Sequence, residues 1–236
     1  DALFLILNAG VDASQAVLTV PNTFVATAGA ILQNGGTPRF RDIGDDHLVW
    51  KGAFAEANKL HRPFIGVHWA GNPLSYDVLQ RKDYIEDACQ AIGASVDGRK
   101  AGTLGYAAAF SLHPLKNVNA LGDGGIVTTD DPRIDERIRL LRNHGLSDRN
   151  TWVEAGYNMR LDSIQAIVGY HTLRQVEEVT EKRIANARRY DEGFRDYNKI
   201  VIPPRNPRVR HVYHLYQVEI RDATAEIRNT ILAQLN

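Results

Sequence analysis

A lysine that directly follows a predicted buried strand is the most conspicuous reactive group in the sequence. Lys116 lies in the segment FSLHPLKNVNALGDGG, residues 110–125, between the apolar run Ala107–Ser111 and a glycine-rich turn. Lysine is rarely buried, because its ammonium group is costly to desolvate. Where burial does occur, it lowers the pKa of the amine, and the free amine can form a Schiff base with a carbonyl compound. A solvent-exposed loop lysine is the alternative interpretation.

An acidic pair follows another predicted strand. Glu86 and Asp87 lie in the segment YIEDACQAIG, residues 84–93. Sheets of α/β proteins place ligand-binding groups at the carboxyl ends of their strands. One carboxylate there could keep a pyridinium nitrogen protonated, which makes a pyridoxal ring an effective electron sink. The alternative is a carboxylate that caps the following helix.

The elements that would position these groups follow from the apolar pattern. Short apolar or β-branched runs predict buried strands, and helical candidates lie between them. The predicted strands are Val17–Val20, Phe64–Trp69, Tyr84–Ala88, Ala107–Ser111 and Ile126–Thr129, and the predicted helices are Ala2–Ala9, Phe24–Asn34 and Leu74–Gln80. This alternation indicates an α/β fold with a mixed, mostly parallel sheet that is covered by helices.

The last third of the sequence is mainly helical. Apolar residues at spacings of four and three, with proline in the first turn, predict a helix over Pro132–Asn143. A longer helical pattern covers Asp162–Tyr197, and Val212–Ile220 alternates like a strand. We therefore predict a large domain at residues 1–180. Residues 181–236 would hold a bridging helix and the truncated start of a small C-terminal α+β domain.

Composition restricts the partners and the location. The sequence has 28 Lys plus Arg and 28 Asp plus Glu, so we expect neither nucleic acid nor an acidic membrane as a partner. No stretch approaches the roughly 20 apolar residues of a membrane-spanning helix. Cys89 is the only cysteine, so the sequence predicts no disulfide, no metal site and a cytoplasmic location. The only methionine is Met159, so we expect a longer full-length protein.

Several stretches together resemble the DegT/DnrJ/EryC1/StrS family of sugar aminotransferases. These enzymes use pyridoxal 5'-phosphate (PLP) and have fold type I. The most specific stretches are EDACQAIGA at 86–94, FSLHPLKN at 110–117 and GDGG at 122–125. Further matches are VPNTFVATA at 20–28, VHWAGNP at 67–73, RNHG at 142–145, GYNMR at 156–160 and HLY at 214–216. The ordered series covers nearly the whole chain and implies the PLP-dependent transferase fold.

The resemblance implies roles for four residues at the cofactor. Lys116 would hold PLP as a Schiff base and, once released, would shuttle the proton between the substrate carbon and the cofactor. Asp87 would pair with the pyridine nitrogen. Gln90 would reach the phenolic oxygen of the ring, and Ser111 would bind the phosphate.

Two further residues have a role by resemblance and a simpler alternative. Phe24 matches the aromatic residue that stacks on the cofactor ring, while ordinary core packing is its alternative. Asn158 matches a residue that reaches the phosphate of the neighbouring subunit, and its alternative is a turn asparagine with a left-handed backbone. The resemblance therefore implies a homodimer with shared active sites.

The implied activity is amino transfer from glutamate or glutamine to a keto-sugar that is carried on a nucleotide. The GDGG sequence after the lysine is, in this family, more typical of amination at sugar C3 than at C4. A PLP-dependent sugar dehydratase of the same fold is an alternative, but such enzymes carry histidine in place of the lysine. A catalytically silent PLP-binding sensor is another, although Lys116, Asp87, Gln90 and Ser111 are all present.

Overall fold

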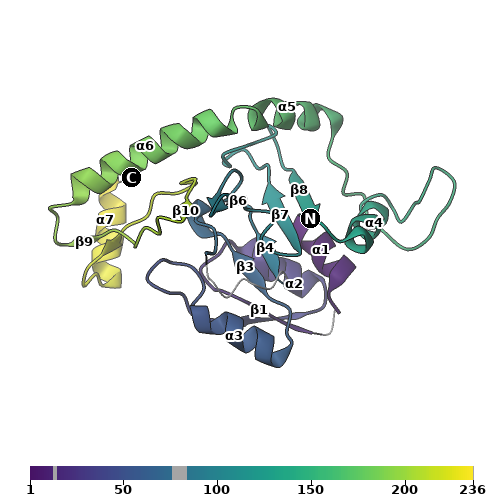
Figure 1. The fold of residues 1–236 in the computed structure, drawn as a ribbon, viewed down its shortest axis with the longest axis horizontal. Helices are drawn as coiled ribbons and strands as arrows, with labels where there is room; N and C mark the ends of the chain where they lie inside the picture. The colour runs from purple at the N-terminus through teal and green to yellow at the C-terminus, as the bar shows by residue number, and fades with distance from the viewer. Residues whose placement is uncertain (13–14, 76–83, 236) are drawn as a thin grey trace.

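A mixed sheet forms the centre of the molecule. The computed structural model describes residues 1–12, 15–75 and 84–235. β3 (Ile65–Val67), β4 (Ile85–Asp87) and β7 (Ala107–Ser111) are parallel, and β8 (Gly125–Thr129) is antiparallel to β7. Their order in the sheet is β3-β4-β7-β8, as Figure 1 shows. This arrangement confirms the predicted α/β fold with a mostly parallel sheet.

A parallel pair of strands continues the sheet beyond β3. These strands are β1 (Ala16–Thr19) and β2 (Thr37–Phe40). Leu18 of β1 forms a parallel bridge with Phe64, and its backbone N–H donates to the carbonyl of Pro63 at 2.9 Å. The sequence pattern did not predict β2, because most of its side chains are exposed and it contains a proline.

Helices α1 (Ala2–Gly10), α2 (Val25–Gln33) and α4 (Pro132–Leu141) cover one face of the sheet. α4 has the predicted proline in its first turn, and its N-cap Asp131 accepts a hydrogen bond from the N–H of Arg133 at 2.9 Å. These contacts and the buried apolar stripe explain why the helix forms where its pattern predicts it.

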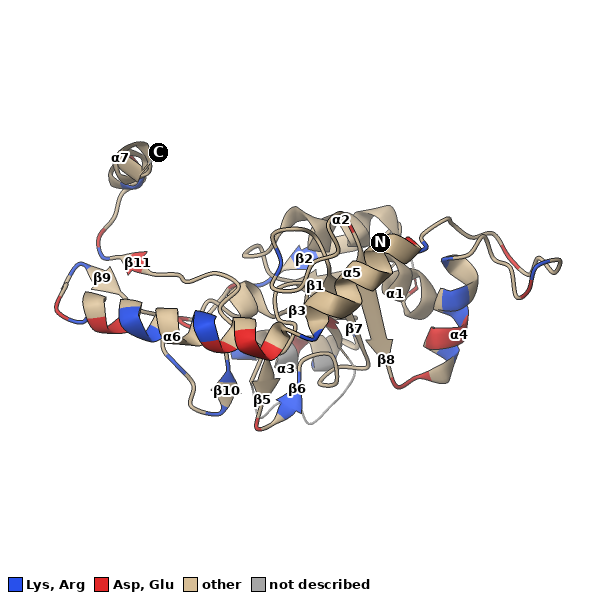
Figure 2. Cartoon of the chain, turned by 90° about the horizontal axis from the view of Figure 1, so that it is seen from above, with Lys and Arg blue, Asp and Glu red and all other residues tan. Residues whose placement is uncertain are grey.

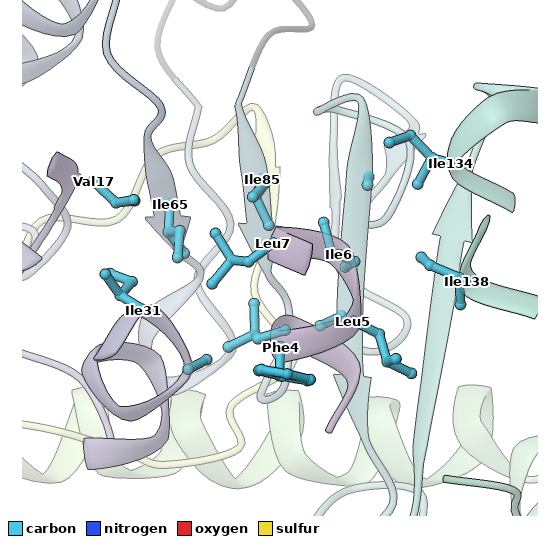
Figure 3. Packing of buried hydrophobic residues seen from close by; sticks show 14 of the residues in the cluster. Phe4, Leu5, Ile6, Leu7, Val17, Ile31, Ile65, Ile85, Ile134 and Ile138 are labelled. Atoms are coloured by element: carbon cyan, nitrogen blue, oxygen red, sulfur yellow. The ribbon is translucent and has the colours of Figure 1, made fainter. Parts of the chain in front are cut away.

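The core between these helices and the sheet depends on α1. All five residues of Leu3–Leu7 are buried, so α1 has no polar face over that stretch. Figure 3 shows Leu7 beside Ile65 and Ile85 of the neighbouring strands. A helix that is apolar on all sides must be enclosed, and here the sheet, α2 and α4 enclose it.

The other face of the sheet carries α3 (Lys51–Leu60), which the sequence pattern did not predict. Its small residues Ala53 and Ala57 pack with Leu18 and Phe64. This packing buries one face of the helix. The helix predicted over Leu74–Gln80 lies mostly outside the described residues.

The long helix predicted over Asp162–Tyr197 is wrong in one respect, because the structure has two helices there. α5 (Ser163–Leu173) ends at Arg174, and α6 (Val176–Phe194) begins after Gln175. Before the break, α5 packs on the lysine loop: Gly169 lies against Leu112 and Ala120, and the Thr172 hydroxyl donates to the carbonyl of Asn119 at 2.7 Å. Figure 1 shows the two helices following one another along one side of the molecule.

The remaining elements are short. β5 (Ser95–Val96) pairs with β6 (Arg99–Lys100) and with β10 (Val209–Arg210), β9 (Ile200–Val201) pairs with β11 (Glu219–Ile220), and α7 (Ala225–Leu235) follows. The strand predicted over Val212–Ile220 is therefore confined to its last two residues. The N–H groups of Val212 and Leu215 instead donate to the carbonyls of Gly71 and Ala70, at 3.0 and 3.2 Å.

The predicted domain boundary between residues 180 and 181 falls inside α6. The division of the chain into two domains remains a prediction. Among the described residues, no helix is both long and apolar enough to cross a membrane.

Candidate active site

Lys116 lies in the loop that joins β7 to β8. Its N–H donates to the carbonyl of His113 at 2.8 Å, and the N–H of Ala120 donates to the carbonyl of Leu112 at 3.0 Å, which closes the loop. The next residue, Asn117, is buried and donates through its side-chain amide to the carbonyl of Val212 at 3.1 Å. The lysine itself is half-buried. A freely exposed loop lysine, the alternative interpretation, does not fit this position.

The two carboxylates at the end of β4 lie in different environments, because successive residues of a strand face opposite sides of a sheet. Asp87 faces α2, where its Oδ2 accepts a hydrogen bond from the Thr27 hydroxyl at 2.6 Å. Its Oδ1 accepts from the N–H of Cys89 at 3.2 Å. A carboxylate has about four acceptor positions, so Asp87 retains capacity to bind a ligand. The alternative reading of Asp87 as only a helix cap is incomplete, since no regular helix follows β4 directly.

Glu86 has no such capacity left. Its Oε1 accepts hydrogen bonds from the N–H groups of Leu104 and Gly105, each at 2.7 Å. Its Oε2 accepts from the N–H of Gly102 at 2.7 Å and from Nε2 of His68 at 2.7 Å. Burial raises the pKa of Glu86, but these hydrogen bonds outweigh it and hold the pKa below its ordinary value. Glu86 therefore has a structural role and stabilises the fold.

His68 is the neutral partner of Glu86. Its Nδ1 accepts a hydrogen bond from the N–H of Leu74 at 3.1 Å, so the proton of the ring resides on Nε2 and is donated to Glu86. The imidazole is completely buried. The motif VHWAGNP thus contributes a structural histidine, which the sequence alone did not distinguish from a ligand-binding one.

Cys89 lies beside Asp87 just after β4, and its thiol senses the charges around it. Burial raises the pKa of this thiol well above its ordinary value, and the charge and hydrogen bond of Asp87 raise it further. The charge of Lys116 opposes this rise. Asp87 and Lys116 therefore both act on the electrostatic environment of this thiol.

The strand partner of Ser111 lies beside the N-terminus of α1. Ser111 is paired with Gly125 across the β7–β8 ladder, and a Cβ placed on Gly125 would lie 3.4 Å from the Cβ of Ala2. The first N–H groups of a helix have no acceptor within the helix, and they favour an anion. Together with the Ser111 hydroxyl, they form a set of donors suited to a phosphate.

Gln90 and Phe24 follow the elements that hold Asp87: Gln90 lies three residues after it, and Phe24 begins the helix of Thr27. Oε1 of Gln90 accepts a hydrogen bond from the N–H of Ala70 at 2.6 Å, which leaves its amide N–H groups as donors. Phe24 is the N-cap of α2, and 66% of its surface is exposed. Ordinary core packing is therefore wrong for Phe24.

Asn158 is not brought together with the other predicted residues. It is exposed, lies in the segment between α4 and α5, and forms an antiparallel bridge with Asn143. Its Oδ1 accepts a hydrogen bond from Nε of Arg160 at 3.1 Å. The left-handed backbone of this region belongs to His144 instead, with φ of 61°.

His214, which the sequence analysis noted only in the HLY match, lies in the segment that packs against the turn after β3. Burial and the charges of Lys116 and Arg183 lower its pKa to about 4, so the imidazole is neutral at physiological pH. Its Nδ1 is buried and has no hydrogen-bond partner among the described residues. The described part of the chain contains no group of three acidic, histidine or cysteine side chains suited to a metal.

Comparison with known proteins places this geometry in a family. Residues 1–236 match the DegT/DnrJ/EryC1/StrS aminotransferase family. The dTDP-3-amino-3,4,6-trideoxy-alpha-D-glucose transaminase of Streptomyces venezuelae is 34% identical over 92% of this chain and 60% of its own length. The solved structure of DesV from S. venezuelae has a TM-score of 0.90 at 33% identity, covering 99% of this chain and 65% of that chain.

A third comparison concerns a cofactor. The structure of NtdA from Bacillus subtilis with the bound cofactor PMP has a TM-score of 0.85 at 26% identity, covering 100% of this chain and 55% of that chain. The chain belongs to the DegT/DnrJ/EryC1/StrS aminotransferase family and has its type I fold. It spans 60% of the length of the S. venezuelae transaminase that it matches.

Because all acceptor positions of the Glu86 carboxylate are used, we expect its replacement to lower the stability of the fold. Glu86→Gln should lower the free energy of unfolding by about 2–5 kcal/mol at pH 7, because an amide nitrogen would face donors from His68 or the backbone. The folded pKa of Glu86 lies below its ordinary value of 4.5, so its contribution is complete above pH 4.5 and is lost as the pH falls through the folded pKa. Denaturant unfolding at pH 7 and at pH 3 measures both effects.

The matched control is Glu136→Gln on the exposed side of α4, which should change the unfolding free energy by no more than about 0.5 kcal/mol. Equal unfolding free energies of Glu86→Gln and the wild type at pH 7 would contradict the structural role of Glu86. A difference between their unfolding free energies that grows towards pH 3 would also contradict it.

Proposed function

We propose that the protein is a PLP-dependent aminotransferase that moves an amino group from glutamate or glutamine to a nucleotide-linked keto-sugar. One observation carries the proposal: the Asp87 carboxylate, oriented by Thr27 with acceptor positions left over, ends β4, and the neighbouring strand β7 leads directly into the closed loop that holds Lys116. A reactive amine, a carboxylate with free acceptor positions and a set of phosphate donors are the groups that PLP requires.

The residues present fit this cofactor. Lys116 would hold its aldehyde carbon, and Asp87 would bind the protonated pyridine nitrogen, with its orientation fixed by Thr27. Ser111 and the first N–H groups of α1 would bind the phosphate. Gln90 would donate to the phenolic oxygen, and the exposed ring of Phe24 is free to stack on the pyridine ring.

PLP supplies the electron sink and carries the amino group between the two substrates. The chain supplies the proton transfer. Nζ of Lys116, once released as a free amine, is the general base that removes a proton from the amino-acid carbon and the general acid that returns it. The hydrogen bonds of Asn117 to Val212 and of Lys116 to His113 hold the lysine loop in place during this transfer.

Support for a sugar acceptor comes from the family and from the name of the S. venezuelae relative, which specifies a 3-amino sugar carried on dTDP. The GDGG sequence at 122–125 agrees with amination at C3. We therefore propose a nucleotide-linked 3-keto-sugar as the first acceptor to test. A panel of 3-keto and 4-keto nucleotide sugars with glutamate or glutamine would identify the acceptor and the donor.

We further propose a homodimer in which α5 contacts a second copy of the chain. Figure 2 shows α5 without charged residues, whereas α6 is charged along its length. Ile164, Ile167 and Tyr170, each about one turn from the next, are 74%, 60% and 58% exposed. An apolar stripe of this kind marks a contact surface. In the dimer, Asn158 would reach the phosphate of the partner's site.

The first prediction concerns the lysine. Lys116→Ala should abolish amino transfer while leaving the circular dichroism spectrum unchanged, because the variant lacks the proton-transfer group. Wild-type protein with PLP should show an absorbance band in the visible range that glutamate bleaches, and the variant should not. Lys100→Ala, an exposed lysine of β6, is the control and should keep full activity. A near wild-type rate in Lys116→Ala would reject the mechanism.

The second prediction concerns the carboxylate. Asp87→Asn should lower turnover at least about tenfold, since a lost charge-assisted hydrogen bond costs about 1.5–3 kcal/mol. PLP retention, measured by absorbance after gel filtration, should fall much less. Asp45→Asn, an exposed loop residue, serves as the control. If Asp87→Asn lost the cofactor but kept its turnover per bound PLP, Asp87 would be only a binding residue.

The third prediction concerns assembly. Ile164→Asp with Ile167→Asp should produce monomers that hold PLP poorly, because dimer and cofactor would stabilise each other by mass action. Ala185→Asp, on an exposed face of α6, should remain dimeric. Sedimentation over a dilution series, with and without PLP, measures both properties. A fully PLP-loaded monomer would reject the shared site and leave the Lys116 prediction untouched.

A further inference from the structure

Three arginines surround a hollow that none of the proposed cofactor residues line. The hollow has a volume of about 280 Å³ and is lined by Leu18, Arg39, Arg41, Leu60 and Arg62. Arg39 is in register with Leu18, and Arg41 follows two residues later, so both side chains leave the same face of the sheet. Leu60 and Arg62 come from the end of α3, so the hollow lies between β2 and that helix end.

The positive charge of the hollow is only partly balanced. Arg41 forms a bidentate pair with Glu56 of α3, in which Nε donates to Oε2 at 2.6 Å and Nη2 donates to Oε1. The hydrogen bond from Arg41 lowers the pKa of Glu56, and the charges of Arg41 and Arg62 lower it further. The carboxylate of Glu56 thus interacts with two guanidinium groups, those of Arg41 and Arg62. Three positive charges and one negative charge leave a net charge of +2.

Among the described residues, neither of the other two arginines forms an ion pair of its own, and Arg62 has only the charge of Glu56, which is already paired with Arg41. Arg39 and Arg62 are exposed, and neither donates a hydrogen bond to another described residue. Like charges held together repel one another unless an anion lies between them. A guanidinium group binds phosphate through two parallel hydrogen bonds, which makes arginine the preferred residue for that anion.

We propose that this hollow is a binding site for a phosphate group, held by Arg39 and Arg62 with Arg41 at its side. The volume is slightly below the range of about 300–1,000 Å³ of pockets for drug-sized ligands, so the ligand is small. Leu18 and Leu60 offer an apolar wall for the organic part of a phosphate ester. The site is independent of the aminotransferase function proposed above.

Isothermal titration calorimetry with inorganic phosphate and with phenyl phosphate tests the proposal on the PLP-loaded chain. Arg39→Gln with Arg62→Gln should weaken binding at least about tenfold, which corresponds to about 1.4 kcal/mol. Arg188→Gln with Arg189→Gln, two exposed residues of α6, removes the same charge elsewhere and should leave binding unchanged. Glu56→Gln should strengthen binding, because it removes the carboxylate that competes for Arg41 and Arg62.

The outcomes separate the site from simpler roles of the arginines. If they only protect the edge of β2 or complement the end of α3, neither phosphate will bind at the hollow and the proposal is overturned. Equal weakening by both double variants would indicate a general charge effect and would also overturn it. Tighter binding of phenyl phosphate identifies an ester as the ligand, and equal affinity identifies the free anion.

Discussion

The fully buried carboxylate of Glu86 is the constraint on which the geometry of the site depends. An ionised carboxylate inside a protein is tolerated only when its oxygens are satisfied, and Glu86 receives two hydrogen bonds on each oxygen. These donors join β4 to the 102–105 loop and to His68 beside the end of β3. With Glu86 fixed on one face of the strand, Asp87 must project from the other face.

The candidate site is assembled from segments that are far apart in the sequence but adjacent at the carboxyl ends of the parallel strands. Ala70 illustrates the connection: its N–H donates to Gln90, and its carbonyl accepts from Leu215. Gly71 beside it has a φ of 92°, and a Cβ there would lie 3.0 Å from the carbonyl of Gln90 and from the N–H nitrogen of His214. The turn after β3 therefore holds the segment around His214 beside Gln90.

The sequence predicted the parts of this arrangement that local patterns encode. The runs that became β3, β4 and β7 are apolar because both faces of the sheet are covered, and Lys116 stands out because it follows such a run. Tertiary contacts decided the rest. Before the break at Arg174, Gly169 and Thr172 pack on the lysine loop, and the pairing of Val212 with Gly71 replaced a predicted strand. The different roles of Glu86 and Asp87 depend on which face of β4 each side chain occupies.

Those different roles can be stated as a count of acceptor positions. A carboxylate offers about four, and Glu86 uses all of them, so it is closed to any ligand. The carboxylate of Asp87 accepts from the Thr27 hydroxyl and from the N–H of Cys89, and Thr27 is itself held by Thr23 at 2.7 Å. Two fixed donors orient the carboxylate while leaving room for a third, charged donor. A carboxylate that is oriented but not saturated is suited to binding a protonated ring nitrogen, and the carboxylate beside it is not.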